Sequence, residues 1–249
     1  MKKILAVVLI ACNEEMNISA MVQGLISRYM QEILEIVVVN DNSTDTTAEV
    51  VRALQKVYPN LKLIIRKAPC GVGRALRDGF RAVSPEAEYI LSMDSDFVQI
   101  LPEFRDLFDV VAAGHEGAIG SRFSHESLLI NYPFVKILCN RGFNLLANLL
   151  LRRRMRDVSN NLKLYRTEIL KDLDIQQPGF AANAETGLKP LLAGRDIREV
   201  PISWINRTIT MGSSSFRIPK VASGYFAVLL RIVRDTWFGK GPNKAVKRL

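Results

Sequence analysis

The chain has 249 residues and a mass of 28.0 kDa, which suits one large domain or one domain with appendages. Its three cysteines lie far apart and no C-x-x-C occurs, so neither a disulfide framework nor a zinc ribbon is indicated. The net charge of +9 calls for an anionic partner, which could be nucleic acid, an acidic membrane surface or a phosphorylated substrate.

The first residues, "MKKILAVVLIACNEE", superficially resemble a signal peptide. The apolar run is short, however, and "NEE" stands where a small-residue cleavage site would be expected. A buried first strand explains the segment better. No stretch approaches the roughly 20 apolar residues that a membrane span needs, so we expect no span.

Apolar runs typical of strands alternate with helically spaced segments through the first half of the chain. Strands are expected at 3–11, 32–40, 61–65, 88–93 and 117–123, and helices at 17–30, 44–58, 73–83 and 102–114. Strands that are apolar throughout are typical of a sheet covered on both faces. The alternation predicts an α/β fold with a largely parallel sheet and helices on both faces.

The pattern changes after residue 130. The sequence predicts a long helix at 135–151, a strand at 159–166, a helix at 182–194 interrupted near Pro190, a strand at 197–207 and an amphipathic helix at 223–239. We expect residues 1–218 to form one domain and 219–249 to form an amphipathic helix with a basic tail. Packing onto the domain and docking on a membrane surface are equally good explanations of the two long helices, which both lead into basic residues.

Polar residues stand at the carboxyl ends of four of the predicted strands. They are Asn13-Glu14, Asp41-Asn42-Ser43, Asp94-Ser95-Asp96 and Ser121-Arg122. Ligands of open parallel sheets bind at the carboxyl ends of the strands, so these residues should gather at one productive edge. Asp94 and Asp96 on one tight turn can reach a single hard cation. The sequence therefore predicts a nucleotide and its metal at this edge.

A glycine-rich segment, "CGVGRALRDG" at 70–79, lies between a predicted strand and a predicted helix. Its backbone could approach a diphosphate. It matches neither the dinucleotide fingerprint nor the P-loop. A plain helix-start turn is an equally good interpretation of this segment.

Eight motifs occur in a fixed order along the chain: "IACNEEMNI", "VVVNDNSTDTT", "GVGRALRDGF", "MDSD", "GSRF", "RDVSNNLKLYR", "AE" at 184–185 and "EVPISWINRTITMGSSSF". This ordered set resembles the family 2 glycosyltransferases, in particular the polyprenyl- or dolichyl-phosphate mannose synthases. The resemblance covers roughly residues 4 to 218. It implies a nucleotide-diphospho-sugar transferase fold of the GT-A type, a divalent metal and inversion at the anomeric carbon of the sugar.

The resemblance also implies roles for individual residues. The nucleoside of the donor would be contacted by Glu14 and Asp41. The metal, Mg²⁺ or Mn²⁺, would be held by Asp94 and Asp96, with Gln99 one residue later than the metal-associated Gln of the mannose synthases. The phosphate and acceptor end would be shaped by Arg122, Asp157, Ser159, Arg207 and Ser214, and the expected substrate-binding set is completed by Ser121, Lys163 and Glu185. Asn161 and Lys163 depart from the family pattern, which has Gly and Arg at these positions.

The favoured reaction is in-line attack by a polyprenyl phosphate on a nucleotide-sugar. The metal would neutralise the diphosphate leaving group. A lipid phosphate is already anionic and needs no strong base, and Arg122, Lys163 and Arg207 could hold the two phosphates together. We expect GDP-mannose as donor, with a UDP-sugar as second choice, and a cytoplasmic protein on the inner face of an anionic membrane.

Two other functions fit the same residues. A saccharide hydroxyl acceptor would need deprotonation, for which Glu185 or Asp157 is the candidate base. Alternatively, the chain could be a basic peripheral-membrane or nucleic-acid-binding protein without catalysis. Asp94 and Asp96 would repel a phosphate backbone, so we expect no nucleic acid partner.

Overall fold

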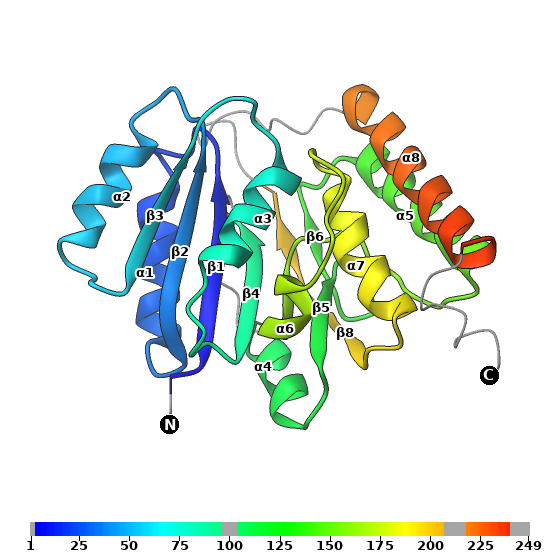
Figure 1. Cartoon of the computed structure of the whole chain (residues 1–249), viewed down its shortest axis with the longest axis horizontal. Coiled ribbons are helices and arrows are strands. Elements are labelled where there is room, and N and C mark those ends of the chain that lie inside the picture. Colours follow the sequence, from blue (N-terminus) through cyan, green and yellow to red (C-terminus); the bar gives the residue numbers. More distant parts are fainter. Residues whose placement is uncertain (1–2, 96–103, 207–217, 240–249) are drawn as a thin grey trace.

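A seven-stranded sheet forms the centre of the protein, and helices cover both of its faces (Figure 1). The computed structural model describes residues 3–95, 104–206 and 218–239. The strands are β1 (Leu5–Ala11), β2 (Ile33–Asp41), β3 (Leu61–Arg66), β4 (Tyr89–Asp94), β5 (Gly117–Ser121), β6 (Leu129–Ile130), β7 (Lys163–Arg166), β8 (Ile197–Pro201) and β9 (Trp204–Ile205). The helices are α1 (Ile18–Tyr29), α2 (Thr47–Gln55), α3 (Val72–Ala82), α4 (Phe104–Ala112), α5 (Phe134–Leu151), α6 (Thr167–Lys171), α7 (Ala182–Leu192) and α8 (Ile218–Trp237).

The sheet has the strand order β3-β2-β1-β4-β7-β5-β8. Strands β1 to β4 pair in parallel and β5 runs parallel to β8, whereas β7 is antiparallel to both of its neighbours. The prediction of a largely parallel α/β sheet is therefore confirmed. Because β2 and β4 lie on opposite sides of β1, the chain changes direction across the sheet there, which is where such folds bind ligands.

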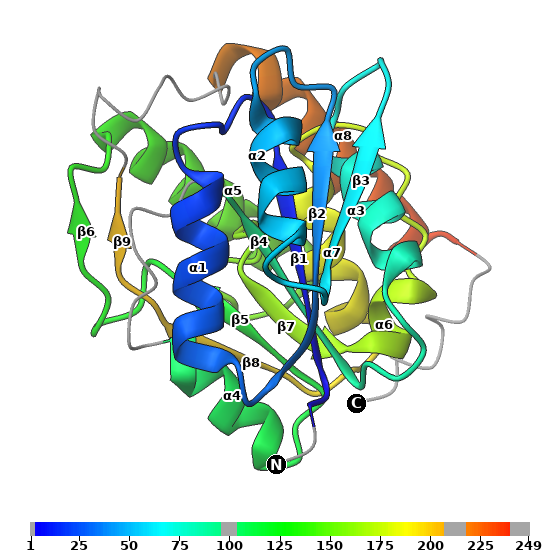
Figure 2. The same ribbon diagram turned by 90° about the vertical axis from the view of Figure 1, so that its left-hand side faces the viewer.

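The side chains of β1 alternate between two hydrophobic cores. Leu5, Val7 and Leu9 face the core formed with α1, α2 and α4, and Ala6 and Val8 face the core formed with α3 and α6. Figure 2 shows α1 and α3 on opposite faces of the sheet. Burial on both faces explains why this strand is apolar throughout.

The antiparallel strand β7 brings a distant part of the chain to the carboxyl edge of the sheet. Because β7 runs against β4 and β5, its amino end lies beside their carboxyl ends. Residues 157–162, which lead into β7, therefore reach the same edge as Asp94. The predicted strand at 159–166 is shorter in the structure and begins at Lys163. Before it, the side-chain amides of Asn160 and Asn161 donate to the Gly120 carbonyl and to Asp94.

Helices α5, α7 and α8 form a third hydrophobic cluster beside the sheet, with α5 and α8 side by side (Figure 1). Val228, Leu229 and Ile232 of α8 are buried in this cluster. The indole Nε1 of Trp237 donates to the carbonyl of Leu150 at 2.9 Å. Packing onto the domain is therefore confirmed for one side of α8, which begins earlier than the predicted residue 223.

Two other predicted elements differ from the structure. Helix α7 runs through Pro190 without a break, because a proline in the last turn removes only one backbone hydrogen bond. The predicted strand at 197–207 is divided into β8 and β9. After β8 the chain leaves the main sheet, and β9 pairs with β6 in a separate two-stranded sheet.

Helix α5 has the length and composition of a membrane-spanning helix, so the expectation that no segment meets this criterion is wrong. Only 17% of the helix is buried in the structure, unlike the core helix of a globular domain. One side of α5 is nevertheless bound to the domain, through Ala147 and Leu151 in the third cluster. This attachment distinguishes α5 from a helix surrounded by lipid.

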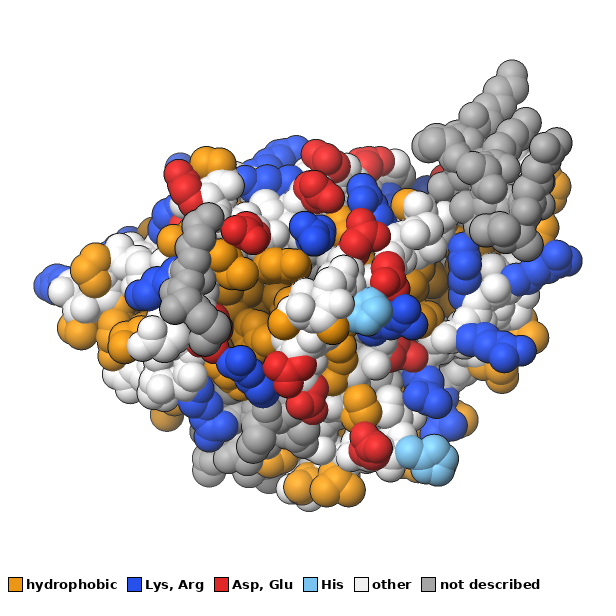
Figure 3. Space-filling model, turned by 90° about the horizontal axis from the view of Figure 1, so that it is seen from below, with side chains coloured by type: hydrophobic (Ala, Val, Ile, Leu, Met, Phe, Trp, Pro, Cys, Tyr) orange, Lys and Arg blue, Asp and Glu red, His pale blue; other side chains and the backbone are white. Residues whose placement is uncertain are grey.

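Basic and acidic side chains are interspersed on the face at the amino ends of the parallel strands (Figure 3). Arg195 pairs with Glu116 there, and Arg198 pairs with Asp196. Such exposed pairs contribute little to stability. Among the described residues, this face therefore carries no single basic patch that would account for the net charge of the chain.

Candidate active site

A cavity of about 470 Å³ lies at the carboxyl edge of the sheet, within the size range of small-molecule sites. Its polar side is lined by Glu14, Asp41, Asp94, Ser95, Arg122, Ser159, Asn160 and Asn161. Its apolar side is lined by α5 and α8 and includes Phe143, Leu146, Tyr225, Phe226 and Leu229. The structure thus brings together most of the described residues that the sequence assigns to the site, next to an apolar surface.

Glu14 and Asp41 occupy the side of the cavity beyond β1 and β2. The carboxylate of Glu14 accepts a hydrogen bond from Asn17 at 2.6 Å. Asp41 forms an ion pair with Arg66 and accepts the backbone N–H of Gly71 at 2.6 Å. These contacts hold both carboxylates in fixed orientations at the part of the edge where the sequence predicts the nucleoside.

The glycine-rich segment before α3 packs against the protein itself. The backbone N–H of Gly73 donates to the carbonyl of Pro178 at 3.0 Å. A Cβ atom on Gly73 would lie 1.9 Å from the carbonyl oxygen of Gln177, so this close approach requires glycine. Of the two interpretations of the segment, the structure favours the helix-start turn.

Asp94 ends β4 and lines the cavity, where its carboxylate accepts a hydrogen bond from Asn161 at 2.9 Å. The hydroxyl of Ser95 donates to the carbonyl of Ile10 at 2.8 Å and ties the turn after β4 to β1. The predicted Asp96 and Gln99 lie outside the described residues, as do Arg207 and Ser214.

A divalent cation fits the donor chemistry of Asp94. Within residues 3–95, 104–206 and 218–239, no three His, Cys, Asp or Glu side chains gather closely enough to hold a metal. Mg²⁺ sites commonly use only one or two carboxylates, together with phosphate oxygens of the substrate. A carboxylate held by an amide at the wall of a polar cavity is suited to that arrangement.

Arg122 and Asp157 form a buried ion pair below the cavity. The guanidinium Nε lies 2.7 Å from Oδ2 of Asp157, and Nη2 lies 2.9 Å from Oδ1. Burial opposes the charged form of Arg122, but the charge and hydrogen bonds of Asp157 raise the pKa of this guanidinium above its usual value. Nη1 donates to the hydroxyl of Tyr132 at 3.1 Å, and the guanidinium also lies over the ring of Trp204. Arg122 is therefore a permanent, fixed cation at the cavity wall.

Three predicted substrate-binding residues lie behind the cavity wall and do not line it: Ser121, Lys163 and Glu185. Glu185 forms ion pairs with Arg231 and Lys189 and accepts the backbone N–H of Gln177 at 2.8 Å. Arg231 of α8 thus points into the domain.

Lys163 is completely buried, and its ammonium donates to the backbone carbonyls of Asn160 and Asn183. Burial lowers the pKa of Lys163 to about 7, and the nearby charges of Asp157 and Asp94 offset only part of this effect. The prediction that Lys163 contacts a substrate phosphate does not fit a side chain in this position, because no part of it is exposed.

Lys163 should make the stability of the protein depend on pH. Its folded pKa lies below the unfolded value, so between pH 7 and 10.5 the unfolded chain binds the extra proton and stability rises with pH. In metal-free protein, the free energy of unfolding of the wild type should rise by about 2 kcal/mol more than that of Lys163→Met between pH 7 and 9. Urea unfolding at both pH values measures this difference, and parallel changes in the two proteins would contradict it.

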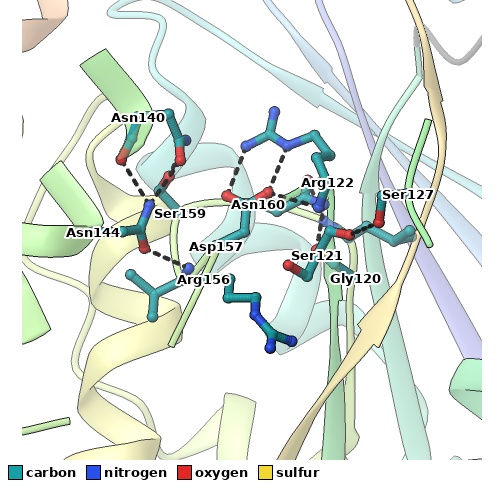
Figure 4. A network of polar contacts seen from close by, with 12 residues as sticks. Gly120, Ser121, Arg122, Ser127, Asn140, Asn144, Arg156, Asp157, Ser159 and Asn160 are labelled. Atoms are coloured by element: carbon teal, nitrogen blue, oxygen red, sulfur yellow. Dashed lines mark hydrogen bonds and ion pairs between the residues drawn. The ribbon is translucent and has the colours of Figure 1, made fainter. Parts of the chain in front are cut away.

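Three asparagines on one side of α5 attach the helix to the loop that carries Asp157. The side-chain amide of Asn140 donates a hydrogen bond to the hydroxyl of Ser159 at 2.8 Å. The side-chain oxygens of Asn144 and Asn148 accept hydrogen bonds, both at 3.0 Å, from the backbone N–H groups of Val158 and Met155 respectively. Figure 4 shows this network continuing through Asp157 to Arg122. These three asparagines are not among the predicted site residues, although their spacing of four in an apolar helix is a signal that they share one side.

The model of the family described as glycosyl transferase family 2 matches residues 6–174, which is more than half of the chain. The chain belongs to this family. A polyprenol monophosphomannose synthase of Mycolicibacterium smegmatis is 26% identical over 187 residues, covering 73% of this chain and 71% of that protein. A dolichol-phosphate mannosyltransferase of Pyrococcus furiosus is also 26% identical, over 74% of this chain but only 52% of its own length. The chain thus spans about half the length of that second relative.

Solved structures agree on the fold. Glucosyl-3-phosphoglycerate synthase from Mycobacterium tuberculosis, in complex with Mn²⁺, UDP-glucose and phosphoglyceric acid, superimposes with a TM-score of 0.70. The match covers 93% of this chain and 80% of that one, with 17% sequence identity. The protein is therefore a family 2 glycosyltransferase with a GT-A-type fold, as the motifs implied.

Proposed function

We propose that the protein is an inverting, metal-dependent glycosyltransferase that moves a hexose from a nucleotide-sugar to polyprenyl phosphate at the cytoplasmic face of a membrane. The favoured donor is GDP-mannose and the transferred sugar is mannose, since both curated relatives named above are mannosyltransferases. Residues 1–218 carry the catalytic site in this proposal, and residues 219–249 contribute to membrane contact.

One observation carries the choice of acceptor: both bases considered for a saccharide hydroxyl are already engaged. The two carboxylate oxygens of Asp157 accept hydrogen bonds from Arg122. Glu185 is fully buried behind the cavity wall and pairs with Arg231 and Lys189. An anionic phosphate acceptor needs no general base, so it suits this site better than a hydroxyl acceptor does.

The apolar side of the cavity supports a lipid acceptor. Phe143 and Tyr225 meet there edge to face, with ring centroids 5.2 Å apart, and Phe226 of α8 is largely exposed beside them. A sugar or phosphoglycerate acceptor has little apolar surface to bury against these side chains. An isoprenoid chain would bury apolar area against it.

In the proposed reaction, an acceptor phosphate oxygen attacks the anomeric carbon while the bond from this carbon to the nucleoside diphosphate breaks. Arg122 and Asp94 both line the cavity. Arg122 would hold the acceptor phosphate by charge, and Asp94, together with Asp96 and Gln99, would hold Mg²⁺ or Mn²⁺. The cation, when bound, would supply Lewis-acid neutralisation of the leaving group. No proton needs to move in this displacement.

A donor and acceptor panel tests the function. Purified protein with Mn²⁺ and polyprenyl phosphate should convert GDP-mannose, in preference to UDP-sugars, into a lipid-linked hexose. Excess EDTA should stop the reaction. Transfer to saccharide acceptors without lipid product would overturn the proposed acceptor, and an equal rate in EDTA would overturn the metal.

A membrane surface is supported by the unusual orientation of α5. Its asparagine side binds the domain, while its opposite side exposes Phe134, Leu138, Leu145 and Leu149. We call these four residues the α5 apolar face. Exposed arginines, namely Arg141, Arg152, Arg154 and Arg234, lie on or close to α5 and α8. This combination is typical of helices that lie in the interface of an anionic bilayer.

Charges introduced into the α5 apolar face should weaken membrane binding. Leu145→Asp/Leu149→Asp should bind anionic liposomes at least about tenfold more weakly than the wild type, since burial of two leucines is lost. High salt should reduce wild-type binding without eliminating it, because the apolar contribution is not screened. Liposome co-sedimentation at low and high salt measures both effects.

Val57→Asp is the matched control, because Val57 is equally exposed but lies after α2. It should bind liposomes like the wild type. The double variant should lose more activity on a long-chain polyprenyl phosphate than on a short, water-soluble analogue. If it instead dissociates a dimer and leaves liposome binding unchanged, the α5 apolar face binds a second copy and the membrane proposal is wrong.

A further inference from the structure

Asn161 forms a hydrogen-bonded bridge between two residues of β4. Its Nδ2 donates to Oδ1 of Asp94 at 2.9 Å, and its Oδ1 accepts the hydroxyl of Ser92 at 2.8 Å. An ionised carboxylate can only accept hydrogen bonds, so the amide nitrogen must be the atom that faces Asp94. The amide oxygen of Asn161 then faces Ser92 and accepts a hydrogen bond from its hydroxyl. The orientation of Asn161 is therefore determined by chemistry.

The fold places this bridge at the end of β4 by strand register. The antiparallel pairing of β4 with β7 ends at Ser92 opposite Lys163, and extending this register by two residues sets Asp94 opposite Asn161. Ser92 and Asp94 are two residues apart, so their side chains share one face of the strand. Ser92 and Asn161 are both 2% exposed, which leaves the bridge little room to move.

We propose that Asn161 is a positioning residue that holds the Asp94 carboxylate in the orientation in which it binds the divalent cation. This inference rests on the proposed function, which assigns the cation to Asp94. The amide acts in two ways: it restricts rotation of the carboxylate, and it selects which oxygen accepts from the protein.

The energetic role of such a contact is well defined. A carboxylate that is free to rotate loses conformational entropy when it binds a cation, and one that is already held loses less. Hydrogen-bond partners of metal ligands typically change metal affinity by 10- to 100-fold when they are removed. The expected effect is therefore on cation affinity and not on the rate once the cation is bound.

Cation binding can be measured directly by titrating Mn²⁺ into the full-length protein with GDP present and following free Mn²⁺ by electron paramagnetic resonance. Asn161→Leu keeps a similar side-chain size but removes both hydrogen bonds, and it should weaken Mn²⁺ binding by roughly 10-fold. Ser92→Ala removes only the anchor of the amide and should weaken binding less, by about 2- to 5-fold. Ser127→Ala removes a hydroxyl bond to the Ser121 carbonyl near the same edge and should leave Mn²⁺ affinity unchanged.

Activity provides a second readout that a merely structural role would not give. In Asn161→Leu, the Mn²⁺ concentration for half-maximal transfer should rise with the dissociation constant, while the plateau at saturating Mn²⁺ stays within about twofold of the wild type. Ser92→Ala serves as the second variant should Asn161→Leu fail to fold, because Ser92 is small and its loss leaves Asn161 in place.

Failure of this inference is distinguishable from failure of the proposed function. If Asp94→Asn loses Mn²⁺ binding while Asn161→Leu and Ser92→Ala bind like the wild type, Asp94 is a ligand and the positioning role is wrong. If Asp94→Asn binds Mn²⁺ as the wild type does, the metal assignment itself is wrong, and the inference falls with it.

Discussion

Asp94→Asn is expected to reduce hexose transfer by roughly 10³-fold, because metal stabilisation of the leaving group is worth several kcal/mol of activation free energy. The substitution keeps the size of the side chain and its hydrogen bond with Asn161 can be remade by rotation of either amide. The thermal unfolding midpoint should therefore change little. Initial rates with GDP-mannose and polyprenyl phosphate, together with calorimetric unfolding, measure the two effects.

Asp109→Asn is the matched control for this prediction, since Asp109 lies exposed on α4 at the other end of the sheet. It should transfer hexose at the wild-type rate. Full activity of Asp94→Asn would remove this residue from the site. A large loss of stability in Asp94→Asn would show that the carboxylate supports the fold rather than the chemistry.

Arg122→Met is expected to destabilise the protein by about 3–5 kcal/mol, because it leaves the carboxylate of Asp157 buried without its cation. The Asp157 side chain is 0% exposed and that of Arg122 is 10% exposed, so solvent cannot replace the lost partner. Transfer should fall at the same time, since the cation proposed to hold the acceptor phosphate is gone. Denaturant unfolding and rate measurements on one preparation test both expectations.

The double variant Arg122→Met/Asp157→Leu separates the structural role from the catalytic role. Replacing both members of a buried ion pair by apolar residues of similar volume is often close to neutral for stability. The double variant should therefore recover most of the lost free energy of unfolding but none of the lost activity. If it recovers activity as well, Arg122 supports the site only through folding, and the phosphate contact is wrong.

The order of strands and helices could be predicted from the sequence because it depends on local periodicity. The apolar run of β1 alternates between two cores, and a strand covered on both faces reads as continuously apolar wherever it lies in the sheet. The polar residues after β1, β2 and β4 could be placed at one edge by the same reasoning. Parallel strands all point the same way, so their carboxyl ends lie at one edge of the sheet.

The position of β7 could not be predicted in this way. Nothing in its four residues distinguishes an antiparallel strand between β4 and β5 from a parallel strand at the end of the sheet. The edge of a strand can pair with a parallel or an antiparallel neighbour, so the direction of β7 depends on how the chain returns to the sheet and on packing against segments that are distant in the sequence. Only the tertiary structure therefore places Asp157 and Asn161 beside Arg122 and Asp94.

For α5, too, local sequence determined the helix itself, and contacts with distant segments decided its orientation. Hydrophobic periodicity determined that this segment is a long helix with a broad apolar side. The structure decided that its asparagines face the domain and that Leu145 and Leu149 face outward, because the backbone groups of the loop at 155–159 needed hydrogen-bond partners. Likewise, the sequence determined that Arg231 and Glu185 are charged, and packing of α8 on α7 made them partners. A pattern specifies the sides of an element, and only contacts between distant elements decide which side is buried.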